Sequence, residues 1–220
     1  IRKEGSAFDL PIAVSILAAS GQIATERIDE YLIIGELSLD GSVKPIKGAL
    51  CIAMLAASEG FKGIILPKDN APQAAVVEGI EVIGVDNLRQ TADFLSGLLT
   101  IEPQSRTAAE QAPGFYGSFD EDFSDVKGQR HVKRALEIAA AGGHNAIMIG
   151  SPGSGKTMLA RRMPTIMPPM STDEILETTK IYSVAGKCPE GDALITKRPF
   201  RAPHHLTSQV ALIGGGTSPQ

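Results

Sequence analysis

The chain has 220 residues, of which 43% are hydrophobic and 21% charged, and its formal net charge is −4. This composition is typical of an ordinary soluble protein and excludes the disordered and fibrous classes. Residues 120–220 carry 12 basic against 10 acidic side chains, an excess too small to predict nucleic-acid binding by itself.

The apolar run nearest the N-terminus, DLPIAVSILAASG (9–21), is too short to span a bilayer and lacks the cleavage pattern of a signal peptide. We therefore expect a cytoplasmic protein with no membrane partner. The two cysteines, Cys51 and Cys188, have neither the number of a disulfide framework nor the spacing of a metal site. Both are expected to be free thiols.

Helical and extended patterns alternate over residues 1–100, which predicts an α/β domain. A helix is expected from Asp9 with Pro11 in its first turn, and YLIIGEL (31–37) is typical of a strand. The chain is then expected to turn at Asp40 and Gly41. Further on we expect a helix at 48–59, a buried strand at 63–67, a short helix at 71–79, a strand at 81–85 and a helix at 86–97.

Residues 101–120 lack hydrophobic periodicity and collect Pro, Gly, Ser and Gln, which predicts a linker to a second domain at 121–220. In that domain a helix is expected over 128–143, where it stops at a double glycine. The apolar run 145–150 predicts a strand, and KTMLARRM (156–163) predicts a helix. Ser171 and Glu174 form a capping-box pattern, which predicts one more helix over 171–183.

The stretch between the predicted strand and helix matches the phosphate-loop pattern G-x-x-x-x-G-K-[ST]. Gly153 and Gly155 let the backbone curl until its N–H groups face phosphate oxygens, where a Cβ would clash. Lys156 supplies a positive charge to the β- and γ-phosphates, and the Thr157 hydroxyl is suited to bind Mg²⁺. The pattern predicts ATP and Mg²⁺ as cofactors, held by Gly150, Ser151, Pro152, Gly153, Ser154, Gly155, Lys156, Thr157 and Met158.

Two further stretches of this half resemble a known family. DVKGQ (125–129) resembles the start of an AAA+ ATPase module, where the residues around Val126 pack against adenine. RPFRAPHHLTSQVALIGGG (198–216) is similar to a segment of the magnesium-chelatase-like AAA+ proteins of the ComM and YifB family. There the segment belongs to an insertion in helix 2 that projects toward the central pore of a ring. The resemblance implies a ring oligomer, expected to be a hexamer, that works as a motor on branched DNA in recombination and transformation.

In that family a Walker B strand, sensor 1 and an arginine finger follow the insertion, whereas this sequence ends at Gln220. We therefore expect this chain alone to bind ATP without hydrolysing it, and no catalytic residue is assigned. His204 and His205 do not predict a metal site, since adjacent histidines in an extended segment point to opposite sides and no Cys or carboxylate lies nearby. Five basic side chains could contact DNA phosphates, other subunits or solvent alone: Arg161, Arg162, Lys197, Arg198 and Arg201.

Residues 1–100 resemble the proteolytic domain of Lon, which has a ribosomal protein S5 domain 2-like fold. The resemblance lies in KEGSAFDLPIAVSILAASG (3–21) and GELSLDGSVKPIKGALCIAMLAASEGFKGIILPKDN (35–70). That family uses a serine nucleophile in D-G-P-S-A-G and a lysine base in G-G-L-K. Aligned without gaps, Ala7 falls on the serine and Leu50 on the lysine. A slip of one residue brings Ser6 onto the nucleophile but restores no base, and a serine without a base is a poor nucleophile.

The first domain is therefore expected to be a pseudoprotease without its N-terminal strands, used for scaffolding or partner contact. The function expected for the intact protein is that of an ATP-driven motor on branched DNA. The alternatives are a chelatase-type or protein-remodelling ATPase, an ATP-dependent protease, which would need the missing lysine, and a nucleotide-binding module without turnover.

Overall fold

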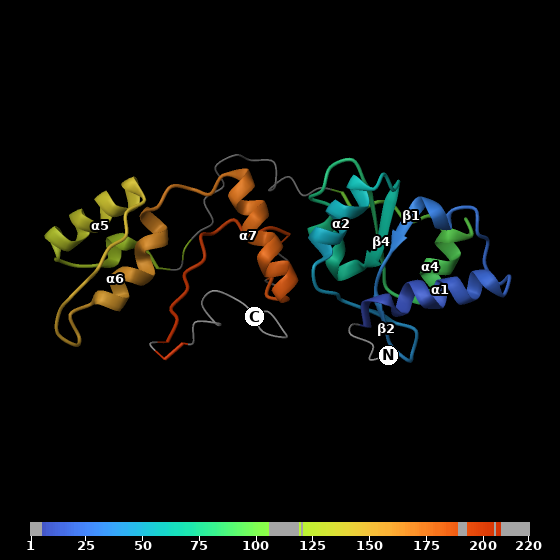
Figure 1. Ribbon diagram of the computed structural model, residues 1–220, viewed down its shortest axis with the longest axis horizontal. Coiled ribbons are helices and arrows are strands. Elements are labelled where there is room, and N and C mark those ends of the chain that lie inside the picture. The colour runs from blue at the N-terminus through green and yellow to red at the C-terminus, as the bar shows by residue number, and fades with distance from the viewer. Residues whose placement is uncertain (1–5, 106–118, 120, 189–192, 205, 208–220) are drawn as a thin grey trace. The chain divides into compact units, whose positions relative to one another are not determined.

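The computed structural model of the chain describes residues 6–105, 119, 121–188, 193–204 and 206–207. The chain divides into two compact units, residues 1–111 with 176–195 and residues 112–175 with 196–220 (Figure 1). Most of the predicted linker, residues 106–118 and 120, lies outside the described residues. Residues 176–195, which the sequence analysis assigned to the second domain, pack with the first unit.

The first unit is a mixed α/β structure built on a parallel sheet, as its alternating patterns predicted. The strand order is β1-β4-β5, and both pairs are parallel. Because parallel neighbours need a crossover, α2 connects β1 to β4 and α3 connects β4 to β5. The elements are α1 (Asp9–Ala19), β1 (Tyr31–Ile33), β2 (Glu36–Leu37), β3 (Val43–Lys44), α2 (Ala49–Ser58), β4 (Gly63–Pro67), α3 (Ala71–Ala74), β5 (Glu81–Val85) and α4 (Leu88–Leu95), with 3₁₀ turns at Ser6–Phe8, Ile28–Glu30 and Lys68–Asn70.

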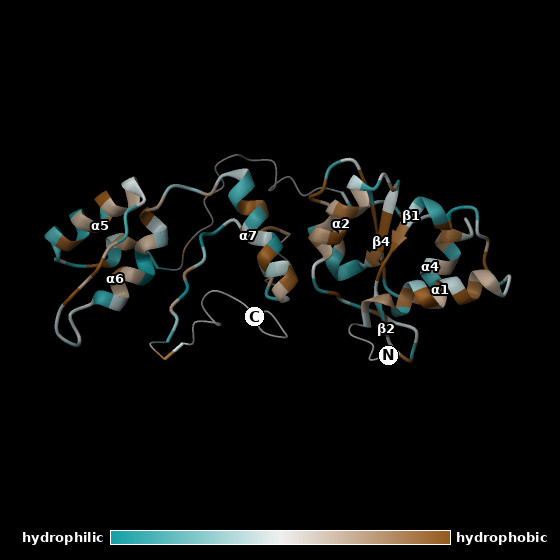
Figure 2. Cartoon of the chain, in the orientation of Figure 1, coloured by the Kyte–Doolittle hydropathy of each residue, from teal (hydrophilic) through white to brown (hydrophobic). Residues whose placement is uncertain are grey.

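The sheet is buried on both faces, which explains why the sequence of β4 is a continuous apolar run. Successive side chains of a strand point to opposite faces, and Ile64 and Ile65 accordingly belong to two different core clusters. Ile65 packs with residues of α1 and α4, whereas Ile64 packs with residues of α2 and α3. Figure 2 shows β4 in the hydrophobic colour among these helices.

The predicted strand 31–37 is divided in the structure, because the chain leaves β4 at Gly35. The Gly35 N–H donates to the Ala7 carbonyl (2.8 Å), and its own carbonyl accepts from the Leu10 N–H (3.0 Å). A Cβ at this position would lie 2.9 Å from Val43 Cγ1, so only glycine allows this close approach. Beyond it, β2 pairs with β3 in an antiparallel hairpin that closes at the predicted turn, where Gly41 has φ +83°.

The C-terminal half of α7 (Thr172–Ala185) belongs to the first unit from Leu176 onward. There Ser183 donates a hydrogen bond to the Gln73 side chain (2.8 Å), and Gln73 donates to the Cys188 sulfur (3.0 Å). Thr179 is also buried, and its hydroxyl accepts from the Ile195 N–H (2.9 Å). These contacts supply partners to polar side chains that burial would otherwise leave unsatisfied.

The second unit has a small core formed by Phe123, Val126, Leu136 and Leu159. Its elements are a 3₁₀ turn at Phe123–Asp125, α5 (Arg130–Gly142), α6 (Lys156–Arg162), a 3₁₀ turn at Met163–Ile166 and the first residues of α7. As predicted, α5 stops at a double glycine, with Gly143 left-handed at φ +62°. No described helix of the chain is both long and apolar enough to cross a membrane.

The strand predicted over 145–150 is wrong: these residues form no regular element. The reason is the lack of a partner strand, since a strand is defined by hydrogen bonds to a neighbour and the described residues of this unit contain none. Ile147 is 85% exposed and Ile149 90% exposed, whereas Met148 between them packs against the core cluster. Residues 147–149 therefore show the alternating exposure of a strand but lack the backbone hydrogen bonds to a neighbouring strand.

Candidate nucleotide-binding site

The predicted phosphate loop lies immediately before α6. Gly153 has φ +80° and Gly155 has φ +84°, and Gly155 is the residue at the N-terminal cap of α6. Both values lie in the left-handed region that a residue with a Cβ rarely adopts. Glycine therefore stands at both loop positions whose backbone is left-handed: Gly155 is fixed by the pattern, and Gly153 lies at one of its variable positions.

The ammonium group of Lys156 lies against the backbone of its own loop. Its Nζ donates to the carbonyls of Gly150 (2.9 Å) and Ser151 (2.7 Å) and to the hydroxyl of Ser154 (3.1 Å). All three acceptors are neutral, so the positive charge at the centre of the loop is not compensated by these contacts. Such an arrangement favours an anion, because an anion provides charge-assisted hydrogen bonds that neutral acceptors do not.

The loop is open to solvent. Ser151, Pro152, Gly153, Thr157 and Met158 are exposed, and Ser154, Gly155 and Lys156 are half-buried. The Thr157 hydroxyl, suited to a hard cation such as Mg²⁺, is therefore accessible. Left-handed glycines, an uncompensated ammonium and an accessible hydroxyl together fit the phosphates of a nucleotide and their Mg²⁺ ion.

The structure places Val126 in the core of the second unit rather than on its surface. Val126 is 2% exposed and packs with Phe123 and Leu159. Its side chain therefore anchors the segment 125–129, while Lys127 and Gln129 are exposed. Gln129 has φ +52°, an uncommon value for a residue other than glycine, and such strained residues cluster at functional sites.

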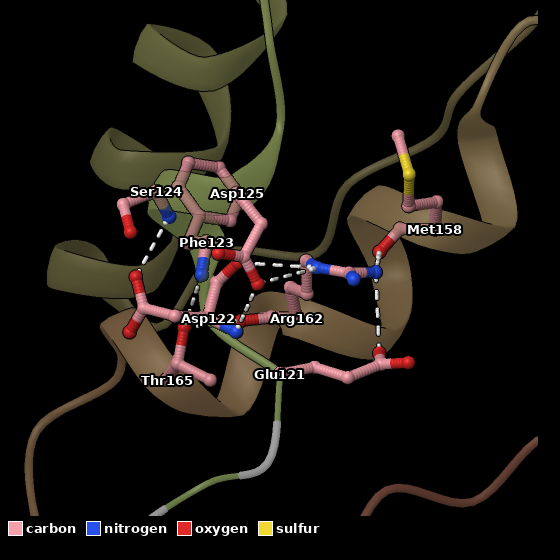
Figure 3. A network of polar contacts seen from close by, with 8 residues as sticks. All are labelled: Glu121, Asp122, Phe123, Ser124, Asp125, Met158, Arg162 and Thr165. Atoms are coloured by element: carbon pink, nitrogen blue, oxygen red, sulfur yellow. Dashed lines mark hydrogen bonds and ion pairs between the residues drawn. The ribbon is translucent and has the colours of Figure 1, made fainter.

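Arg162, which the sequence analysis named as a candidate for DNA contact, lies in a polar network within the unit (Figure 3). Its Nε donates to the Asp122 carbonyl (3.1 Å), and its Nη1 pairs with the Glu121 carboxylate (3.1 Å). The Asp122 carboxylate accepts from the Ser124 N–H (2.7 Å), and hydrogen bonds from Ser124 hold the pKa of Asp122 below its ordinary value. The Arg162 side chain is 13% exposed, and its guanidinium is engaged in these contacts within the unit.

Arg198 likewise holds its own unit together. Its Nε donates to the Pro168 carbonyl (2.7 Å), and its Nη2 lies 3.0 Å from the Glu174 carboxylate. Glu174 forms the predicted capping box with Ser171, since the Ser171 N–H donates to the carboxylate (2.8 Å) and the Glu174 N–H to the Ser171 hydroxyl (3.2 Å). Of the five basic candidates, the exposed ones are Arg161, Lys197 and Arg201.

Two predicted features fall partly outside the described residues, namely the segment 198–216 from residue 208 onward and His205 of the histidine pair. Within the part of the chain that the structure describes, no group of three or more His, Cys, Asp or Glu residues could hold a metal ion. Both cysteines, Cys51 and Cys188, are free.

In the first unit the two positions of the protease-like dyad hold core residues. Leu50 in α2 is completely buried, and Ala7 packs against the cluster that contains Ile64. Lys47, the nearest lysine in sequence to Leu50, lies against the backbone of Gly186, where an added Cβ would be 2.6 Å from its Cε. No base therefore stands at the position where the alignment expects one.

Both halves of the chain match known protein families. Residues 122–220 match the family described as magnesium chelatase, subunit ChlI, and residues 1–70 match the family described as subunit ChlI of Mg-chelatase. The uncharacterized protein YifB of Escherichia coli is 41% identical over 218 residues, and competence protein ComM of Haemophilus influenzae is 39% identical over 221 residues.

Each of these two matches covers 99% of this chain but 42% of the relative, so the chain spans less than half the length of the proteins it resembles. A shorter match of 66 residues, covering 30% of this chain and 14% of the relative, is 38% identical to the DNA repair protein RadA of Pseudomonas aeruginosa.

Proposed function

We propose that this chain, which belongs to the magnesium-chelatase-like family that includes ComM and YifB, binds MgATP at residues 150–158 and is the nucleotide-binding part of a motor that acts on DNA. The main support for a nucleotide site here is the geometry of the phosphate loop. Gly153 and Gly155 are left-handed, and Lys156 is held by neutral oxygens of the loop. No other described segment combines these features.

Within this site each residue has a distinct task. The loop backbone, shaped by Gly153 and Gly155, presents N–H groups to phosphate oxygens, and Lys156 leaves its loop acceptors for the phosphate charge. Thr157 would hold the metal ion, and segment 125–129 would border the base. Bound ATP supplies a phosphoanhydride bond, and Mg²⁺ offsets the charge of its phosphates.

The binding step is tested with MgATP and this chain, by isothermal titration. Lys156→Ala should abolish measurable binding while the thermal unfolding midpoint changes little, because the contacts of the ammonium are confined to its own exposed loop. Lys197→Ala removes an exposed lysine from the same unit and should bind MgATP as the wild type does. Unchanged affinity in Lys156→Ala would contradict the assignment of the loop.

The choice of DNA as substrate is supported by the names of two relatives, a competence protein and a DNA repair protein. We propose that the whole protein assembles into a ring, within which neighbouring subunits complete the ATPase site. The test is ATP hydrolysis by the full-length protein with and without forked DNA. Stimulation by DNA supports a DNA motor, whereas no effect favours a chelatase-type or protein-remodelling ATPase.

We further propose that the first unit has an S5 domain 2-like, Lon-type fold that has lost peptidase activity and acts as a scaffold. Its parallel sheet with helical crossovers is compatible with this fold. The buried Leu50 argues against an ATP-dependent protease, because a hydrolytic serine needs a base to accept its proton.

A further inference from the structure

The side chain of Arg162 connects two parts of the second unit that are far apart in sequence. It is the last residue of α6, the helix that starts with Lys156 and Thr157. Its guanidinium reaches the segment before α5, where it contacts the Asp122 carbonyl (3.1 Å) and the Glu121 carboxylate (3.1 Å), and its Nη1 also donates to Met158 O (3.3 Å) in α6 itself. One planar group thus joins residues 121–122 to the helix of the phosphate loop (Figure 3).

A second link runs beside the first. The Phe123 N–H donates to the Thr165 hydroxyl (3.1 Å), and that hydroxyl donates to the Arg162 carbonyl (2.8 Å). Phe123 is 5% exposed and packs in the core with Val126 and Leu159. The segment 121–126 is therefore fixed to the end of α6 by both polar and apolar contacts.

The charged groups nearest the guanidinium are carboxylates, and Lys133 also acts on Asp122. Glu121, Asp122 and Asp125 lie within one short segment, and the Asp125 carboxylate is 3.8 Å from Arg162 Nε. Without Arg162 these carboxylates would repel one another next to a helix whose other end receives a polyanion. Lys156 and Arg162 lie at the two ends of α6, roughly 9 Å apart along the helix axis at the usual rise per residue.

The anchored segment leads directly into strained backbone. Gly128 has φ +70° and Gln129 has φ +52°, and α5 begins at Arg130. A left-handed residue other than glycine persists only where its surroundings hold it in place. The contacts of Arg162 and Thr165 lie on the N-terminal side of Gln129, the strained residue, and α5 begins directly after it.

We infer that Arg162 is a positioning residue that sets where segment 121–129 lies relative to the phosphate loop, and thereby how tightly the nucleoside part of ATP is held. This inference rests on the proposed function, because it assigns that segment to the nucleoside side of the same site. The guanidinium of Arg162 contacts protein groups of residues 121, 122, 125 and 158, so we expect it to act through them rather than on the ligand. Its effect should therefore depend on whether the ligand carries a nucleoside.

The test compares two ligands, MgATP and magnesium tripolyphosphate, by titration against the purified chain. Arg162→Ala should raise the dissociation constant of MgATP by about tenfold, the scale of a lost charge-assisted hydrogen bond, and that of tripolyphosphate by less than about threefold. Arg161→Ala is the matched control, because Arg161 is the exposed neighbour on the same helix, and should change neither constant. Arg162→Lys keeps the charge but not the planar fork and should lose most of the preference for MgATP.

If Arg162→Ala fails to fold by circular dichroism, Thr165→Val decides, since it removes the hydroxyl that accepts from Phe123 while keeping the side-chain volume. An equal loss for both ligands, or no loss for either, overturns the inference. If the wild type binds neither ligand, the proposed function itself is wrong. Lys156→Ala should lose the binding of both ligands, and this loss would show that the wild type binds them at the phosphate loop.

Discussion

Ser183 and Gln73 form a buried hydrogen bond of 2.8 Å between side chains that are 110 residues apart in sequence. Ser183 is 3% exposed and Gln73 is 8% exposed. The Ser183 carbonyl also accepts the Gly48 N–H (2.9 Å). A segment that follows the phosphate loop in sequence therefore completes the polar core of the first unit.

Ser183→Ala should destabilise the first unit, because it leaves the Gln73 side-chain oxygen buried without this donor. The expected loss in the free energy of unfolding is about 1–3 kcal/mol. Urea denaturation followed by circular dichroism measures it. Ser58→Ala, which removes an exposed serine that bonds only within its own helix, should cost far less.

Cys188 should react slowly with iodoacetamide in the folded chain. Burial raises the pKa of its thiol, although the hydrogen bond from Gln73 acts in the opposite direction, and only the thiolate attacks the reagent. In a Cys51→Ser background, mass spectrometry at pH 8 should show slower labelling than in the urea-unfolded chain. Equal rates in both states would contradict the protection expected from partial burial and a raised pKa.

The same raised pKa has a consequence for stability. The unfolded thiol ionises at a lower pH than the folded one. The contribution of this thiol to the free energy of unfolding is therefore fully present below the unfolded pKa and is lost as the pH rises through the folded pKa. Cys188→Ser in the same background should show less of this loss at alkaline pH.

Local signals predicted the elements that local chemistry determines. The Ser171–Glu174 capping box, the Asp40–Gly41 turn and the double-glycine stop of α5 all appear where the sequence placed them. Long-range contacts left no such signal. The residues next to Gly35 in sequence do not predict its contacts with Ala7 and Leu10, which divide the predicted strand.

The site shows the same division. Gly153 and Gly155 adopt the left-handed backbone that lets the loop curl, as their sequence positions predicted. Arg162, by contrast, resembled any surface arginine next to Arg161, and only tertiary structure brings Glu121 and Asp122 to it. The sequence shows an acidic cluster before α5 and two adjacent arginines after the loop, but only the fold shows that Arg162 pairs with that cluster.

Leu50→Lys should not create a peptidase, even though it restores the lysine of the protease-like pattern. Leu50 is fully buried, and a charged lysine there has no partner to offset its desolvation. We expect no casein digestion, a loss of about 2–5 kcal/mol of stability and the same result when Ser6→Ala is added. Cleavage that appears in Leu50→Lys and vanishes with Ser6→Ala would contradict the pseudoprotease assignment.

The cap of α7 should fail in acid. Hydrogen bonding from the Ser171 N–H holds the pKa of Glu174 below its ordinary value, helped by Arg198. Because the folded pKa is the lower one, the stabilisation is complete above the ordinary pKa and disappears as the pH falls through the depressed one. Glu174→Gln should therefore unfold at a lower temperature than wild type at pH 7, and this difference should shrink as the pH falls below the ordinary pKa of a glutamate. A difference in unfolding temperature that does not shrink in acid would show that the carboxylate charge does not act through this cap.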